Sequence, residues 1–202
     1  MKTPFDIIVI ASRHRPPIIT QHLRGTPYQT WHGEDYPKPD IKVAPRAQVL
    51  GLPTGAGPYR CFRAHQDATK LAKADAMLMF EDDARPINGR WKRIAAEALP
   101  LLNRYEIVSL HGRDQANIIK SHPAAGTRFN VLGPIDKGGI QMVWQLGALA
   151  YLMRQETAAK LRALAWDGFP VDLVICNDFS FCVADYTPFR HDRQHGSLVE
   201  TR

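Results

Sequence analysis

The sequence predicts an α/β fold, in which helices cover a sheet of buried strands. Two short apolar runs, Phe5–Ala11 and Ala76–Phe80, have the length and composition of strands buried on both faces. Other segments carry apolar residues at helical spacing, of which 58–73 and 155–164 are the clearest. The second apolar run leads directly into three consecutive carboxylates. A strand that ends in acids brings their charge to the carboxyl edge of a sheet, where open α/β folds bind ligands.

The remaining elements follow from local composition. The expected strands, in chain order, are Phe5–Ala11, Tyr28–Trp31, Ala76–Phe80, Glu106–Leu110, Ile140–Trp144, Gly147–Met153 and Phe179–Ala184. The expected helices are Ile18–Leu23, Pro58–Lys73, Asn88–Leu102 and Gln155–Leu164. Segments 33–57 and 114–139 are rich in turn-forming or polar residues, and we predict two loops that lie over a ligand cleft.

Length and composition favour a single domain over residues 1–202, with 45% hydrophobic and 23% charged residues. No stretch has the roughly 18 to 20 apolar residues of a membrane span. Asp6 interrupts the first apolar run, and no small-residue cleavage site follows, so we expect a strand rather than a signal peptide and a cytoplasmic protein. Three cysteines without paired spacing predict buried free thiols. The net charge of +6 favours polyanionic partners: sugar nucleotides, nucleic acid or an anionic membrane surface.

The acidic triplet Glu81, Asp82 and Asp83 is the main candidate site. Three adjacent carboxylates repel one another unless a positive group lies among them. A divalent cation that also holds a diphosphate meets this need, because hard cations take oxygen ligands and bridge to phosphates. The alternative is a solvated acidic turn after a core strand.

Basic residues near the predicted edge are candidates for nucleotide contacts. Ser12 and Arg13 follow the first strand, at the place where a nucleotide lies in a sheet of this kind. Arg60 and Arg63 are candidates for the diphosphate or base on electrostatic grounds, and each basic residue could also be a solvated surface group. His65 is expected on the helix face toward the sheet or cleft, where a structural histidine is the more common outcome. Together with Cys61 it supplies only two metal ligands, which is a poor case for a site.

Several blocks of sequence resemble family 25 glycosyltransferases, the lipopolysaccharide- and collagen-type galactosyltransferases. The blocks are Gly57-Pro58-Tyr59-Arg60-Cys61-Phe62-Arg63-Ala64-His65, then Phe80-Glu81-Asp82-Asp83-Ala84, then Gly147-x-x-x-Tyr151 with Ala158-x-x-Leu161, and Pro170-Val171-Asp172. Arg60 and Ala64 replace a glycine and a serine of the family pattern. The blocks cover about half the chain, and the first sixty residues and 114–139 depart from the pattern.

The resemblance implies a GT-A-like, Rossmann-like nucleotide-binding domain with a mixed, mainly parallel sheet and helices on both faces. It implies Mn²⁺ or Mg²⁺ held against a nucleotide-sugar donor, with a UDP-sugar preferred. Alternating strand residues point the same way, so Glu81 and Asp83 are expected as metal ligands, and Asp82 as a contact to the ribose or a metal-bound water. His191 or His195 would supply a late third ligand.

The family is inverting, which implies a carboxylate base that takes a proton from the acceptor hydroxyl. Asp172 matches the family position and Asp178 is the second candidate, while a helix cap is the structural alternative for Asp172. The acceptor is open between a saccharide such as lipopolysaccharide core, which we prefer, and a hydroxymethylated pyrimidine in DNA, a DNA-modification activity that requires base flipping. The alternative functions are a non-catalytic, basic nucleic-acid-binding domain and a metal-dependent phosphodiesterase.

Overall fold

The structure is a computed structural model. It describes residues 3–12, 17–33, 36–37, 45–52, 55–87, 89–112, 117–124, 127–145, 147–185 and 188–191. Within these ranges no helix is both long and apolar enough to span a lipid bilayer.

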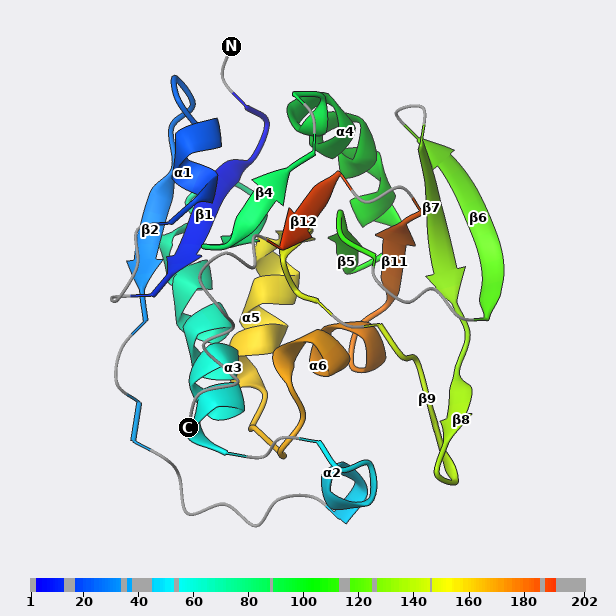
Figure 1. Cartoon of the computed structure of the whole chain (residues 1–202). Helices are drawn as coiled ribbons and strands as arrows, with labels where there is room; N and C mark the ends of the chain where they lie inside the picture. Colours follow the sequence, from blue (N-terminus) through cyan, green and yellow to red (C-terminus); the bar gives the residue numbers. More distant parts are fainter. Residues whose placement is uncertain are drawn as a thin grey trace.

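A sheet of eight strands, in the order β2-β1-β3-β10-β5-β11-β7-β6, forms the centre of the described fold (Figure 1). In chain order the strands are β1 (Asp6–Ala11), β2 (Gln29–His32), β3 (Ala76–Glu81), β5 (Ile107–Ser109), β6 (Ile118–Ala124), β7 (Thr127–Leu132), β10 (Ala150–Arg154) and β11 (Phe181–Ala184). All of them except β10 and β7 run in one direction, because β10 is antiparallel to both β3 and β5, and β7 to both β11 and β6. The carboxyl ends of β1 and β3 and the amino end of β10 therefore meet at one edge.

Helices cover both faces of this sheet. On one face lie α3 (Ala56–Ala68), α5 (Gln155–Ala163) and α6 (Val171–Asn177); on the other lie α1 (Ile19–His22) and α4 (Trp91–Ala98). The remaining helical segments are α2 (Pro45–Val49) and the 3₁₀ turns η1 (Thr69–Leu71) and η2 (Leu99–Asn103). The predicted fold class is confirmed: it is α/β, with a mixed sheet in which most strands run the same way, consistent with a Rossmann-like, GT-A-type fold.

The apolar run of β3 shows why this sequence forms a central strand. Its side chains alternate between two cores: Met77 and Met79 join the core under α3, whereas Leu78 and Phe80 join the core under α4. Since both faces are covered, every position must be apolar, which explains the unbroken run. Full burial of a side chain such as Phe80 contributes about 1.5–3 kcal/mol to stability. The run stops being apolar at Glu81, where the strand emerges at the edge.

The helix α3 begins at Ala56, just before the predicted start at Pro58, and ends at Ala68, before the predicted end at Lys73. Gly55 is the extended residue before the first turn, and Pro58 lies within that turn, where its missing N–H removes no helical hydrogen bond. The inward face carries Phe62, His65 and Ala68, all buried. This face directs His65 toward the end of β3.

Four parts of the fold differ from the sequence-based expectation. The loop predicted over 33–57 contains a short helix, α2. The loop predicted over 114–139 is wrong for its centre, because β6 and β7 form a hairpin that extends the sheet, followed by a small hairpin of β8 (Ile135–Lys137) and β9 (Ile140–Met142). The hairpin is at the sheet edge and half exposed, so it carries polar residues typical of loops. The helix α6 was not predicted. Likewise, the pairing of β4 (Ala84–Pro86) with β12 (Phe189–His191) was not predicted, because neither three-residue strand has a periodicity to detect.

The cysteines behave as predicted. All three are free thiols, with Cys176 and Cys182 buried and Cys61 partly buried.

Candidate functional site

The acidic turn lies at the edge of the sheet where β1 and β3 end. Glu81 is the last residue of β3, and Asp82 and Asp83 form the turn into β4. Because β1 and β3 are parallel neighbours, with Ile10 opposite Glu81, the residue after β1 lies beside the turn. The sequence-based prediction that the acids follow a buried strand to a sheet edge therefore agrees with the structure.

Asp82 ties this turn to the connection between β1 and α1. Its Oδ2 accepts a hydrogen bond of 2.9 Å from the backbone N–H of Ser12, and its backbone oxygen accepts one of 2.7 Å from Ile18. The side chain of Asp82 is buried at 6% exposure. Ser12 and Asp82, two of the predicted nucleotide contacts, are thus in direct contact with each other, and the carboxylate holds the backbone just after β1.

Glu81 is held by a buried chain of polar side chains. His65 is completely buried, and its Nε2 lies 3.2 Å from Glu81 Oε1 while its Nδ1 lies 2.6 Å from the hydroxyl of Tyr151 on β10. A neutral imidazole that donates from Nε2 to the carboxylate accepts the Tyr151 hydroxyl proton at Nδ1. Burial, and then the nearby Glu81 carboxylate, raise the pKa of Tyr151 well above its usual value, so its hydroxyl keeps its proton.

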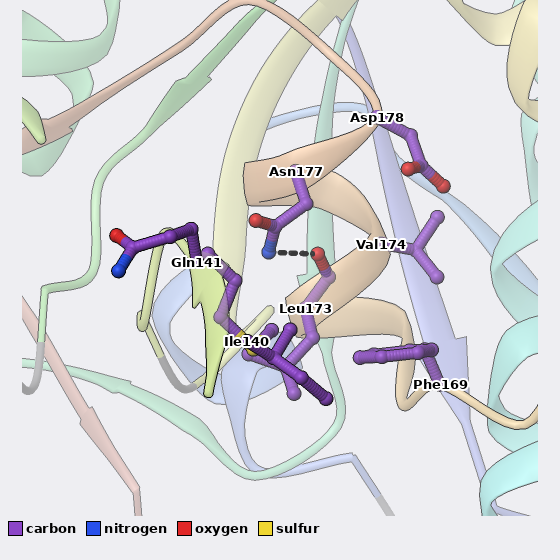
Figure 2. A pocket seen from close by; sticks show the side chains of 8 residues that line it. Ile140, Gln141, Phe169, Leu173, Val174, Asn177 and Asp178 are labelled. Carbon is purple, nitrogen blue, oxygen red and sulfur yellow. Dashed lines mark hydrogen bonds between the residues drawn. The ribbon is translucent and has the colours of Figure 1, made fainter. Parts of the chain in front are cut away.

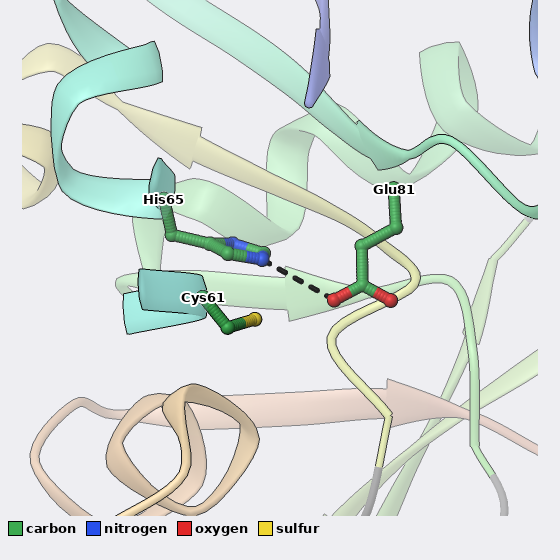
Figure 3. A group of neighbouring side chains, drawn as sticks. All are labelled: Cys61, His65 and Glu81. Carbon is green, nitrogen blue, oxygen red and sulfur yellow. Dashed lines mark hydrogen bonds and ion pairs between the residues drawn. The ribbon is translucent and has the colours of Figure 1, made fainter. Parts of the chain in front are cut away.

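Cys61 completes a group of three potential metal ligands. One turn before His65 on α3, its thiol joins the imidazole and the Glu81 carboxylate, and the three ligand atoms lie within 4.8 Å of one another (Figure 3). Among the residues that the structure describes, this is the group whose spacing suits a metal ion.

Asp172 approaches the same site from the first turn of α6. Its Oδ2 accepts a hydrogen bond of 3.0 Å from the backbone N–H of Gly147, and its Oδ1 accepts one of 3.0 Å from Leu173. Burial raises the pKa of Asp172, the bond from Gly147 opposes that rise, and the Glu81 carboxylate adds to it. The N-cap of α6 is Pro170, without a side-chain capping bond, so Asp172 lies in the first turn rather than at the cap; it also lies within electrostatic reach of Glu81.

Negative charge converges on this edge. Burial raises the pKa of the Cys61 thiol far above its usual value, and Glu81, Asp172, Asp83 and Asp82 each raise it further. Four carboxylates, from β3, the turn after it and α6, thus act on the thiol of Cys61. Such a cluster attracts cations strongly, since charges interact more strongly away from bulk water.

A late histidine lies close to the acidic turn in the backbone pairing. In the β4–β12 ladder His191 is opposite Ala84, the residue that follows Asp83. The side chain of His191 is not described, and His195 and Arg13 lie outside the described residues.

The other predicted residues lie away from this group. Arg60 and Arg63 are on a different face of α3: Arg60 Nε donates to the backbone oxygen of Tyr36 at 3.3 Å, and Arg63 forms an ion pair of 3.5 Å with Asp67. The described contacts of both arginines are thus with Tyr36 and its surroundings, rather than with the acidic turn.

Asp178 is at the opposite end of α6 from Asp172. It is exposed and lies at the rim of a cavity of about 210 Å³ between β9 and α6, lined mainly by apolar side chains such as Ile140, Leu173 and Val174 (Figure 2). The two candidate bases therefore occupy different environments, and Asp172 has Glu81 as an electrostatic neighbour.

The sequence-based site omitted Cys61 and Tyr151. The spacing of Cys61 and His65, one helical turn apart, was a usable signal, but the third ligand comes from another element and could not be paired with them. Tyr151 was noted only as part of the family resemblance, because nothing in a single sequence shows that a strand tyrosine meets a helix histidine.

No protein-family model and no curated protein matches this sequence. Among solved structures, the chain is similar to A197 from STIV, with a TM-score of 0.44 and 11% identity over 94% of this chain and 84% of that one. HddC from Yersinia pseudotuberculosis gives a TM-score of 0.38 at 13% identity, over 93% of each chain. A glycosyltransferase involved in the glycosylation of the major capsid of PBCV-1 gives 0.36 at 10% identity, over 78% of this chain and 63% of that one. These likenesses are too distant to assign a family, and membership of family 25 stays a prediction.

Proposed function

We propose that this protein is a metal-dependent glycosyltransferase that moves a sugar from a nucleotide-sugar donor, preferably a UDP-sugar, to a hydroxyl acceptor. The observation that carries the proposal is the gathering of Glu81, Asp82, Asp83 and Asp172 at the carboxyl edge of a Rossmann-like sheet. Open α/β sheets bind nucleotides at this edge. A nucleotide diphosphate is itself an anion, so an acidic edge suits it only together with a cation.

The residues present fit a hard divalent cation. Carboxylate oxygens are the ligands that Mn²⁺ and Mg²⁺ prefer. Burial is the main cause of the raised pKa of the Cys61 thiol, and the Glu81, Asp172, Asp83 and Asp82 carboxylates raise it further, which places their negative charge near one point. Asp83 and Glu81 would hold the ion, with His191 or His195 as a further ligand; the pairing of His191 with Ala84 supports the former. When bound, the ion neutralises the charge that develops on the departing nucleoside diphosphate.

Asp172 is our proposed base. Its backbone contacts hold the carboxylate in place, and each of its oxygens keeps a lone pair for an acceptor hydroxyl. A raised pKa makes it a stronger base than an exposed aspartate. The acceptor oxygen forms its bond to the anomeric carbon as the bond from that carbon to the phosphate oxygen breaks, and the acceptor proton passes to Asp172. Attack opposite the leaving group gives inversion.

Ser12 and Asp82 would shape the nucleotide side of the site. Since the Asp82 carboxylate holds the backbone of Ser12, the carboxyl end of β1 lies beside the acidic turn. We propose that Ser12 and Arg13 contact the base or ribose. Arg60 and Arg63 could reach a donor only by leaving their contacts with Tyr36 and Asp67.

A donor screen tests the proposal. Purified protein with Mn²⁺ is incubated with UDP-, GDP- and CMP-sugars, and the slow release of nucleotide is measured. We expect release from one nucleotide class that stops when the metal is chelated. If a folded protein releases nucleotide from none of these donors, the assignment as a glycosyltransferase is wrong.

Two variants test the metal ligands. Glu81→Gln and Asp83→Asn keep side-chain size and should abolish metal-dependent nucleotide binding measured by calorimetry. Glu97→Gln is the matched control, because Glu97 is an exposed acid on α4 paired with Arg93. If all three variants bind nucleotide with the same metal-dependent affinity, Glu81 and Asp83 are not metal ligands.

The acceptor is tested separately. We propose a saccharide acceptor, with hydroxymethylated DNA as the second possibility, because the net charge of +6 suits a polyanion. Transfer of labelled sugar to a core oligosaccharide or to hydroxymethylated DNA distinguishes the two. Gel shifts with hydroxymethylated and plain DNA at increasing salt then separate specific binding from general attraction to phosphate.

A further inference from the structure

The group formed by Cys61, His65 and Glu81 has a chemistry different from that of the acidic turn. It contains one sulfur, one nitrogen and one oxygen ligand, all directed toward a common point (Figure 3). We propose that these three residues form a binding site for a thiophilic divalent cation, with Zn²⁺ as its natural occupant.

The ligand types select the metal. Zn²⁺ accepts thiolate, imidazole and carboxylate ligands together and takes tetrahedral geometry, whereas Mn²⁺ and Mg²⁺ prefer oxygen ligands. Three protein ligands leave a fourth position for water. The ligand atoms lie within 4.8 Å of one another, so small side-chain rotations bring them to the closer spacing of a zinc site.

The surroundings of His65 favour metal binding at Nε2. Its Nδ1 lies 2.6 Å from the Tyr151 hydroxyl, and metal-bound histidines almost always have such an outer partner at the second nitrogen. Metal binding requires the tautomer in which the ring proton has moved from Nε2 to Nδ1 and is donated to the Tyr151 oxygen, which leaves the Nε2 lone pair for the ion beside Cys61 and Glu81. The ring is fully buried and stacks at 12° to that of Tyr151, so its orientation is fixed before an ion arrives.

The charge around Cys61 and the exposure of Glu81 also suit a bound cation. Asp82, Asp83 and Asp172 lie within electrostatic range of the Cys61 thiol, and their negative charge favours a cation bound there. The side chain of Glu81 is 22% exposed while that of His65 is fully buried, so an ion can enter past the carboxylate and be held against the helix.

Glu81 also belongs to the proposed Mn²⁺ site, and one carboxylate cannot serve both ions fully. Zn²⁺ and Mn²⁺ should therefore compete. Binding of Zn²⁺ can be measured without any sugar donor, so its outcome is independent of whether the protein transfers a sugar.

Cobalt is the probe for the thiolate ligand. Reduced, chelator-treated full-length protein is titrated with Co²⁺, and the near-ultraviolet absorption produced by a cobalt–thiolate bond is recorded. We expect the signal to saturate at one ion per chain and to disappear when Zn²⁺ is added. Changes to outer partners cost about 10–100-fold in metal affinity, so loss of a direct ligand in Cys61→Ser should weaken Zn²⁺ binding by more than about 100-fold and abolish the signal.

Cys176→Ser is the matched control. Cys176 is also a thiol in the interior, but its described contacts are backbone carbonyls such as Val143 O at 3.4 Å and the side-chain amide of Asn177 at 3.3 Å, which a serine hydroxyl can also satisfy. This variant should bind Co²⁺ and Zn²⁺ like the unchanged protein. Absence of the thiolate signal in the unchanged protein, or its persistence in Cys61→Ser, overturns the proposal.

A second measurement covers the case in which Cys61→Ser does not fold, as judged by circular dichroism. The unchanged protein is treated with iodoacetamide with and without Zn²⁺, and labelling at each cysteine is followed by mass spectrometry of peptides. Zn²⁺ should slow labelling of Cys61 relative to Cys176. Equal protection of both thiols, or of neither, rejects the site.

Discussion

The hydroxyl of Tyr151 helps to orient the other side chains of the site. It is the described partner of His65 Nδ1, and both rings are buried. Glu81 is oriented through His65, so an interaction two side chains away determines where the first carboxylate of the acidic turn points.

Tyr151→Phe should therefore destabilise the protein without changing its shape. Removing the hydroxyl leaves a buried ring nitrogen without this partner, which costs about 1–3 kcal/mol of unfolding free energy. Urea denaturation measures the change. Tyr28→Phe, at an exposed tyrosine, is the control and should have almost no effect. Equal stability of the two variants would mean that the short Tyr151–His65 contact contributes nothing.

The environment of Asp172 predicts the pH dependence of transfer. Burial raises its pKa from the ordinary value of 3.8, and Glu81 contributes in the same direction. A base acts in its ionised form, so kcat/KM should fall as pH decreases through this raised pKa, which lies above the range of an exposed aspartate.

Asp172→Asn should abolish activity at every pH. Asp178→Asn should remain active, and its kcat/KM should still fall at low pH as in the unchanged protein. Initial-rate measurements at a series of pH values decide the matter. If Asp178→Asn is the variant that loses activity, the base is Asp178 and the assignment of Asp172 is wrong.

Single residues also show how far the sequence alone could lead. Glu81, Asp82 and Asp83 could be placed at a sheet edge because they come at the end of a strand that the apolar pattern predicts, whereas Asp172 was chosen only through the family resemblance. The roles proposed for Arg60 and Arg63 rested on charge alone, and charge does not indicate which face of a helix a residue occupies.

The antiparallel pair β4–β12 has a large effect for its size, because it carries Phe189 into the core. The Phe189 ring lies 5.0 Å from that of Phe80 and 5.9 Å from that of Trp91, between centroids, and is fully buried. The same pairing aligns His191 with the residue after the acidic turn. Packing of Phe189 into the core therefore also fixes the backbone position of His191, the proposed metal ligand.

Phe189→Ala should destabilise the protein by about 3–5 kcal/mol, the cost of removing a buried aromatic side chain and leaving a cavity. Thermal and urea unfolding measure it. Ile87→Ala, at an exposed residue just after β4, should change stability by no more than about 0.5 kcal/mol. A small effect at Phe189 would show that β12 is not packed against the core.

Elements with a strong pattern were predictable, and short ones were not. The strands β1 and β3 and the helices α3 and α5 have an unbroken apolar run or a clear helical period. The half-exposed hairpin β6–β7 and the three-residue strands β4 and β12 depend on partners far away in the chain, which local composition does not report.

The described molecule as a whole combines a positive net charge with a strongly negative site. A +6 surface draws nucleotides, saccharide phosphates or DNA toward the protein, while the site itself requires a cation before it accepts an anion. Composition predicted the positive net charge, and the acidic triplet predicted the negative site. Which parts of the surface carry each charge could be seen only in the folded chain.

The late position of β12 in the chain has a consequence for assembly. Joining it to β4 closes a very long loop, which is entropically slow and must wait until the sheet and α4 have formed a surface for it. After dilution from denaturant, far-ultraviolet ellipticity should recover first, and Trp91 fluorescence should change in a later phase that is missing in Trp91→Phe. A single shared rate would rule out this order. A newly made chain would then be compact but inactive until β12 pairs with β4, and the proposed metal site would form only at this last step of folding.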